Sequence, residues 1–102
     1  MQIVNKVYDI VPSFPDEERF GMSVQMTKCA TSIPSNIAEG SAKRSAKDYA
    51  RFVEISLASS FELETQSLIV KERKWVDEET ITELLKMIET EQRRISKFID
   101  KL

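Results

Sequence analysis

The sequence predicts an all-α protein, an antiparallel up-down-up-down four-helix bundle with a shortened first helix. The chain of 102 residues holds only two Gly and three Pro, too few for the turns of a β-sandwich or barrel. Its apolar residues, 41% of the total, recur at helical spacing in four stretches. The stretches are joined by short connections, so neighbouring helices should pack antiparallel in one domain over residues 1–102.

The first two expected helices are separated by a proline-containing turn. Residues 1–11 carry an apolar stripe of helical period that ends before Pro12. Pro15 suits the first position of the second helix, where acidic residues 16–18 would face the positive end of the helix dipole. The second helix is expected to end between Gly40 and Arg44. Its stripe comprises Met22, Met26, Cys29, Ile33 and Ile37, widened by Phe20, Val24, Ala30 and Ala38. Cys29 is therefore expected to be a small buried side chain rather than a reactive thiol.

The third helix is expected to begin at a capping box and the fourth at an aspartate cap. Ser45 and Asp48 have the Ser-x-x-acid form directly before an apolar run that continues to Trp75. This run is apolar around much of its circumference, so we expect the helix to have a second packing partner, another subunit. Asp77 is expected to cap the fourth helix. The fourth helix repeats Ile81, Ile88, Ile95 and Leu102 every seven residues.

Residues 31–40 are the least typical of a plain bundle, because a proline and several hydroxyls lie within one helix. Pro34 lacks an N–H and clashes with the carbonyl of Ala30, at a cost of about 3 kcal/mol. We therefore expect a kink near Pro34. Either Ser32 caps a restarted helix, or the hydroxyls of Thr31 and Ser35 bond to the freed backbone groups.

Four polar residues adjoin core positions or lie near them: Asn36, Glu39, Glu62 and Glu64. Any that are buried need partners, which Ser56, Ser59 and Ser60 can supply in an interhelical hydrogen-bond network that fixes the register. The carboxylates can alternatively work as acid and base or bind a hard metal, but di-iron bundles need Glu-x-x-His pairs. The chain has no His and one Cys, so the sequence predicts no catalytic residue, no metal site, no cofactor and no enzyme activity.

The charge pattern leaves one candidate contact for nucleic acid. The net charge of −2 lacks the basic excess of a general nucleic-acid binder. Residues 41–53 and 93–102 each hold four cations against one carboxylate, mostly where helix dipoles favour cations. Lys47 and Arg51 are the exception, because they lie in the opening turns of the third helix and share a face. With Lys43 and Arg44 they are the candidate phosphate contacts for RNA or DNA.

No stretch approaches the roughly 18 apolar residues of a membrane span, and the N-terminus lacks the pattern of a signal peptide. The sequence therefore predicts a cytoplasmic protein with no membrane contact.

Three stretches resemble a known bacterial family. The run SIPSNIAEG at residues 32–40, the basic stretch DYARF at 48–52 and SFELETQ at 60–66 resemble the four-helix-bundle proteins called 23S rRNA intervening-sequence proteins. The resemblance covers about residues 5–102. It marks as structural motif residues Pro34, Asn36, Glu39, Gly40, Glu62 and Glu64. The family's proteins usually begin with a longer first helix that carries a Trp-containing segment, so the first helix is expected to be short by comparison here.

The resemblance implies a four-helix bundle and homopentameric barrels. It also implies similarity to the accessory variability protein of diversity-generating retroelements, which works beside a reverse transcriptase and contacts nucleic acid. Being encoded within an rRNA insertion describes a gene's location and not an activity. The leading hypothesis is a self-associating, non-enzymatic interaction or accessory module, whose partner is a further copy or another protein. The alternative is a nucleic-acid-binding accessory protein that uses the basic patch between the second and third helices.

Overall fold

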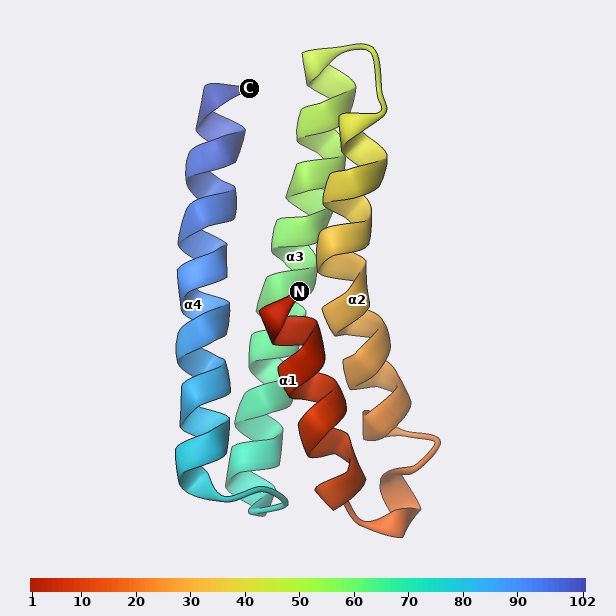
Figure 1. Ribbon diagram of the computed structural model, residues 1–102, viewed down its shortest axis with the longest axis vertical. Helices are drawn as coiled ribbons and strands as arrows, with labels where there is room; N and C mark the ends of the chain where they lie inside the picture. The colour runs from red at the N-terminus through yellow and green to blue at the C-terminus, as the bar shows by residue number, and fades with distance from the viewer.

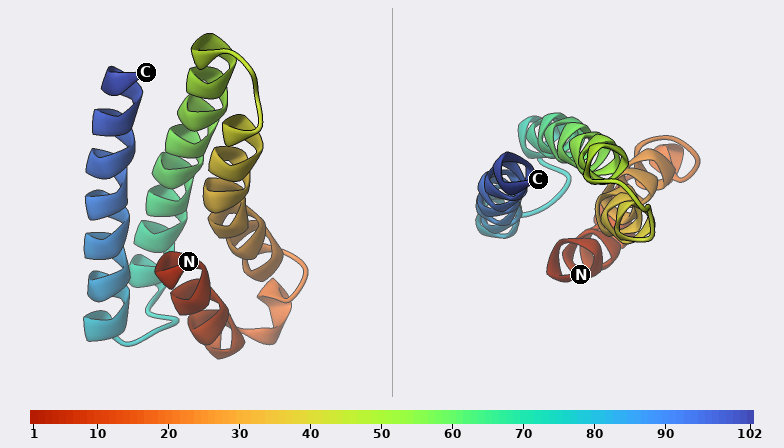
Figure 2. Two further views of the ribbon diagram at one scale, coloured as in Figure 1. Left: turned by 45° about the horizontal axis from the view of Figure 1, so that its top comes forward. Right: turned by 90° about the horizontal axis from the view of Figure 1, so that it is seen from above.

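The computed structural model describes all of residues 1–102 and contains four α-helices and no strands (Figure 1). The helices are α1 (Gln2–Ile10), α2 (Met22–Ser41), α3 (Ala46–Arg73) and α4 (Glu78–Lys101). The helices α2, α3 and α4 run up and down the long axis of a molecule 44 Å long, and α1 lies beside them over the lower half only (Figures 1 and 2). The predicted up-down-up-down bundle with a short first helix is confirmed.

The four helices occupy the corners of a square. The helix α1 packs on α2 and α4, and α3 packs on the same two helices from the opposite corner. The helices α2 and α4 therefore meet through α1 and α3 rather than by direct packing on each other (Figure 2).

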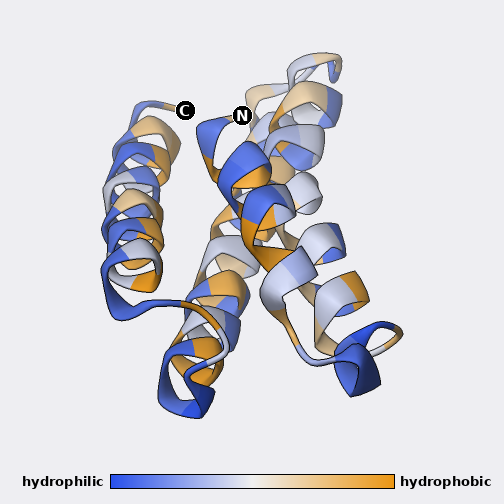
Figure 3. Ribbon diagram, turned by 60° about the horizontal axis from the view of Figure 1, so that its bottom comes forward, coloured by the Kyte–Doolittle hydropathy of each residue, from blue (hydrophilic) through white to orange (hydrophobic).

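The hydrophobic core is a cluster of sixteen buried apolar residues drawn mainly from the four helices. Apolar residues (orange) lie on the inward sides of the helices and polar residues (blue) on the outward sides of much of the bundle (Figure 3). The helix α1 contributes Ile3, Val4, Val7 and Ile10. Burial of such side chains is worth about 1.5–3 kcal/mol each, which offsets the ordering of a helix too short to persist alone.

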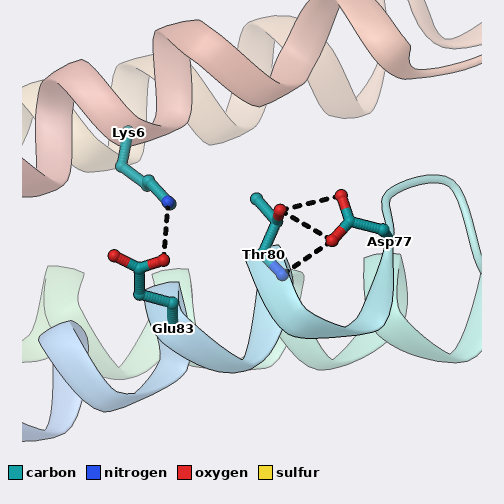
Figure 4. A network of polar contacts seen from close by, with 4 residues as sticks. All are labelled: Lys6, Asp77, Thr80 and Glu83. Atoms are coloured by element: carbon teal, nitrogen blue, oxygen red, sulfur yellow. Dashed lines mark hydrogen bonds and ion pairs between the residues drawn. The ribbon is translucent and has the colours of Figure 1, made fainter.

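The two predicted helix caps are confirmed. The Ser45 hydroxyl accepts the backbone N–H of Asp48 at 3.1 Å. The Asp77 carboxylate accepts the backbone N–H of Thr80 at 3.0 Å and its hydroxyl at 2.7 Å (Figure 4). These hydrogen bonds lower the pKa of Asp77, and the bond from the Thr80 hydroxyl has the larger effect. Nearby, Lys6 of α1 pairs with Glu83 of α4 at 3.1 Å (Figure 4).

The predicted start of the second helix at Pro15 is wrong. Residues Asp16–Glu18 form a separate 3₁₀ turn, and α2 begins at Met22, with Gly21 outside helical geometry as its N-cap. The acidic turn still serves the helix, because a Glu18 carboxylate oxygen accepts the backbone N–H of Met22 at 3.2 Å. Phe20, expected on the buried stripe, is instead 87% exposed in this turn.

Of the two alternatives for the segment around Pro34, a helix restarted at a Ser32 cap does not occur. The helix α2 is continuous from Met22 to Ser41, with Pro34 inside it. Ser32 caps nothing and donates its hydroxyl to the carbonyl of Cys29 at 2.7 Å. Thr31 likewise bonds to carbonyls one turn earlier in its own helix. All of these bonds go to carbonyls that precede Ala30. The hydroxyls of Ser32 and Thr31 therefore do not bond to the Ala30 carbonyl, which lacks a partner because Pro34 has no N–H.

The heptad repeat of α4 is buried at Ile81, Ile88 and Ile95. Leu102, its expected fourth member, follows the end of α4 and is 38% exposed. None of the helices combines the length and the apolar character needed to cross a bilayer.

Candidate functional site

The outward face of α3 carries large apolar side chains. Ile55, Phe61, Leu68 and Ile69 are 45%, 51%, 50% and 39% exposed. The inward face of the same helix is built largely from smaller or polar side chains, including the fully buried Ser56, Ser60 and Ser67. The apolar girdle predicted for this helix is therefore real, and much of it faces away from the bundle. We call these four residues the α3 outer face.

The four candidate phosphate contacts lie together at the turn between α2 and α3. Lys43, Arg44, Lys47 and Arg51 are all exposed. None of them is in either of the two ion pairs of the protein, Lys6–Glu83 and Arg93–Glu89.

The sequence interpretation missed an aromatic ring at the centre of this basic cluster. The Lys43 Nζ lies 4.9 Å from the centroid of the Phe52 ring, and the Arg51 guanidinium carbon lies 5.7 Å from it. Both distances are within the range of cation–π attraction. The signal available in the sequence was the direct adjacency of Phe52 to Arg51, but the approach of Lys43 depends on how α2 crosses α3.

The motif residues of α2 have structural roles that differ from one another. Gly40 is buried where α2 contacts α3, and a β-carbon there would lie 2.7 Å from Phe52 Cβ. Only glycine allows this close approach. Asn36 is half-buried and donates to the carbonyl of Ser32 in its own helix at 2.8 Å. Glu39 is exposed. The expected interhelical network therefore does not include Asn36 or Glu39.

Glu62 and Glu64 face different neighbours. Glu64 is half-buried and accepts from Gln92 Nε2 of α4 at 3.3 Å. Glu62 is exposed and lies near the Cys29 thiol of α2. Burial first, and then the Glu62 carboxylate, raise the pKa of Cys29 to about 12. The thiol is thus buried and protonated at neutral pH, as its place on the stripe predicted.

The interhelical hydrogen bonds use only part of the set of groups that the sequence suggested. Ser56 of α3 donates to the carbonyl of Ile33 of α2 at 2.8 Å, and the Cys29 thiol donates to the carbonyl of Ser59 at 3.0 Å. Ser60 bonds within its own helix to Leu57 at 2.6 Å. The register is therefore held mainly by side chains on backbone carbonyls, with Glu64 as a motif residue that accepts a hydrogen bond from another helix.

The carboxylates considered as an acid–base pair or a metal site do not converge. Glu39 is exposed near the end of α2, Glu62 lies towards α2, and Glu64 bonds to α4. No three His, Cys, Asp or Glu side chains are grouped closely enough to hold a metal ion.

The three stretches on which the family resemblance rests all lie on the α2–α3 pair, with Gly40 at its closest approach and Phe52 opposite it. The family described as 23S rRNA-intervening sequence protein matches residues 1–97 of the chain. The chain belongs to this family. The match confirms the resemblance found in the sequence.

A solved member of the S23 ribosomal protein family has the same fold. This protein of unknown function from Bacteroides thetaiotaomicron superposes with a TM-score of 0.82 and 22% sequence identity, covering 96% of this chain and 88% of that chain. The likeness shows that this chain has the same bundle fold. The comparison with curated proteins gives no match.

Proposed function

We propose that this protein is a self-associating, non-enzymatic helical module that acts as an interaction or accessory component. The observation that carries the proposal is the α3 outer face. Its four exposed apolar side chains lie on one helix between Ile55 and Ile69, a distance of about 21 Å at the helical rise. Large apolar side chains exposed together on one helix are typical of protein–protein contacts.

The composition of α3 supports the same proposal. Three fully buried serines occupy inward positions, while larger apolar side chains lie outside. A helix that served only a monomer would gain more from the reverse arrangement, since burial of a large apolar side chain stabilises by about 1.5–3 kcal/mol. We infer that each subunit covers the α3 outer face of its neighbour, head to tail, in a closed ring. The family resemblance implies five subunits.

The non-enzymatic part of the proposal rests on the residues available. The chain has no His, its one thiol is buried with a pKa of about 12, and its motif carboxylates point to different neighbours. These groups do not form an activated nucleophile with a base beside it.

Sedimentation velocity at micromolar concentration tests the proposal. We expect a single closed oligomer for the natural chain, and monomers for Phe61→Glu and Leu68→Glu, because each variant places a carboxylate in the contact. The matched control is Phe20→Glu, which alters an aromatic residue that is even more exposed, at 87%, but lies outside the α3 outer face. A monomeric natural chain, or dissociation by Phe20→Glu alone, would contradict the proposal.

The basic cluster favours a second candidate function, nucleic-acid binding. The cations of Lys43 and Arg51 lie 4.9 Å and 5.7 Å from the centroid of the Phe52 ring. Arg44 and Lys47 are exposed and are not in the ion pairs of the protein. Cations beside an aromatic side chain suit contact with phosphates and a stacked base. In a ring of subunits the cluster would be repeated around the axis, which enlarges its field.

Binding of RNA and DNA oligonucleotides across a range of salt concentrations tests this candidate. We expect Lys47→Glu and Arg51→Glu each to weaken binding and to reduce the salt slope by about one unit, the change for one lost phosphate contact. Lys28→Glu, an equal charge change at an exposed position of α2, should leave binding unchanged. An unchanged salt slope in the first two variants would remove the candidate.

A further inference from the structure

A head-to-tail ring needs two different surfaces on each copy of the chain. In the proposed self-association the α3 outer face is one of them, and the neighbouring copy must offer another surface to cover it. The central part of a protein–protein contact is depleted of charged side chains. The second surface is therefore expected on an outward side of the bundle that carries no charge over several helical turns.

The outward side of α2 has this property. Of the 20 residues of α2, only Lys28 and Glu39 are charged. Opposite the buried side of the helix runs a row of uncharged residues, none of them fully buried. At about 100° per residue, Lys28 and Glu39 lie along one edge of this row and not in it. We call the residues of the row the α2 outer face: Val24, Thr27, Thr31 and Ser35.

The outward sides of α4 and α1 are less suitable. Glu79, Lys86 and Arg93 recur every seven residues on the outward side of α4, and all three are exposed. The helix α1 has 9 residues, so it spans about 13 Å against about 21 Å for the α3 outer face. The helix α2 has 20 residues, a length of about 30 Å that is sufficient to cover that face.

The threonine hydroxyls of the α2 outer face already have partners within the helix. Thr27 donates its hydroxyl to the carbonyl of Ser23 at 3.0 Å, and Thr31 donates to the carbonyl of Thr27 at 3.0 Å. A group that is paired in this way costs less to cover than a buried group without a partner. The α2 outer face is therefore suited to contact with apolar side chains.

The two outer faces match in side-chain size and in height along the bundle. The α3 outer face carries large side chains and the α2 outer face smaller ones, an arrangement that fills the space between facing helices. The Cys29 thiol of α2 bonds to the carbonyl of Ser59 of α3. Because the two helices are antiparallel, two residues from this bond in each helix place Thr27 at the height of Phe61.

We propose that the α2 outer face of one copy binds the α3 outer face of the next. The assignment rests on the proposed self-association and names the surface that completes it. The helices α2 and α3 occupy neighbouring corners of the square, so their outward sides point in different directions, as a head-to-tail contact requires (Figure 2). In a ring whose axis runs along the helices, neighbours meet at equal heights, and Phe61 of one copy lies against Thr27 and Thr31 of the next.

Sedimentation velocity of a mixture of two variants tests the assignment. Thr31→Glu places a carboxylate in the α2 outer face, as Phe61→Glu does in the α3 outer face. We expect each variant alone to be monomeric, and an equimolar mixture to form a dimer and nothing larger. In that dimer the intact α3 outer face of the Thr31→Glu chain covers the intact α2 outer face of the Phe61→Glu chain, which also shows that both chains are folded.

The variants, alone and mixed, are measured at a higher concentration than the natural chain, since a single contact lacks the gain from ring closure. Gln25→Glu is the matched control, because it makes the same charge change at an exposed position of α2 outside the row, and it should assemble like the natural chain. Assembly of Thr31→Glu like the natural chain, a mixture that stays monomeric, or dissociation by Gln25→Glu would each overturn the assignment and leave the self-association standing. A monomeric natural chain would instead refute the self-association and the assignment with it.

Discussion

Replacement of Gly40 by Ala is expected to destabilise the protein, although Ala is the better helix former. Gly40 lies in the last turn of α2 and is buried against α3. An added β-carbon would lie 2.7 Å from Phe52 Cβ, 3.0 Å from Tyr49 Cδ1 and 3.3 Å from the Tyr49 carbonyl oxygen. The first of these atoms is attached to the backbone of α3, so relief of the overlap requires the two helices to move apart.

The two opposing effects have known sizes. Helix propensity favours Ala over Gly by about 1 kcal/mol, and overpacking of a well-packed contact costs about 1–3 kcal/mol. We therefore expect the free energy of unfolding to fall by about 1 kcal/mol, equivalent to a Tm lower by about 4–8 °C for a domain of this size. Urea unfolding followed by circular dichroism measures it, at one fixed protein concentration because association shifts apparent stability.

The control is Ala38→Gly, at an exposed position two residues earlier in the same helix. Propensity alone should cost this variant about 1 kcal/mol, so Gly appears unfavourable at position 38 and favourable at position 40. The reasoning is refuted if Gly40→Ala raises the free energy of unfolding by the amount that propensity alone predicts.

Three further predictions concern caps and titrating groups. Ser45→Ala removes the hydroxyl that accepts a backbone N–H at the start of α3 and should lower the free energy of unfolding by about 1 kcal/mol. Ser96→Ala, at an exposed position inside α4, should not lower it, because Ala is the better helix former. In the folded chain the pKa of Cys29 is about 12, above the ordinary 9.0. The stability that the protonated thiol contributes is therefore lost as the pH rises from about 9 towards 12. Unfolding measured at a series of pH values should show a smaller alkaline loss of stability in Cys29→Ala, and equal losses in the two proteins would contradict this. The hydrogen bonds with Thr80 lower the pKa of Asp77 in the folded state. The stability that the ionised carboxylate contributes is therefore present above the ordinary pKa of 3.8 and is lost as the pH falls through the lowered pKa. Asp77→Asn keeps a capping side chain and should flatten this acid dependence, and an unchanged acid profile would count against the cap.

The sequence was sufficient for the features that depend on local pattern. The stripe of α1, the caps Ser45 and Asp77 and the continuous apolar run of α3 each follow from neighbours a few residues apart. The start of α2 was misplaced, because a proline followed by acidic residues suits a helix N-terminus and an isolated 3₁₀ turn equally well. The structure is a separate 3₁₀ turn rather than the start of α2 because the backbone at Gly21 is not helical. A glycine permits this conformation but does not require it, so the sequence does not decide between the two.

Features that depend on how helices cross were not accessible in the same way. Pro34 left a restarted helix open as one alternative, but the flanking apolar residues Ala30, Ile33 and Ile37 hold both halves of α2 on one core. Tertiary packing outweighed the local cost there. Lys47 and Arg51 were found from their opposition to the helix dipole, whereas the place of Phe52 beside Lys43 required the geometry of the α2–α3 contact.

The square arrangement with one half-filled corner has a consequence for local opening. The lower turns of α4 pack on both α1 and α3, while its last turns pack on α3 alone, through contacts such as Tyr49–Phe98. A segment with one neighbour separates at lower free energy than one with two. Amide hydrogens of residues 94–101 should therefore exchange with solvent through an opening that leaves the α2–α3 pair closed, and protection along α4 should rise steadily towards residue 81.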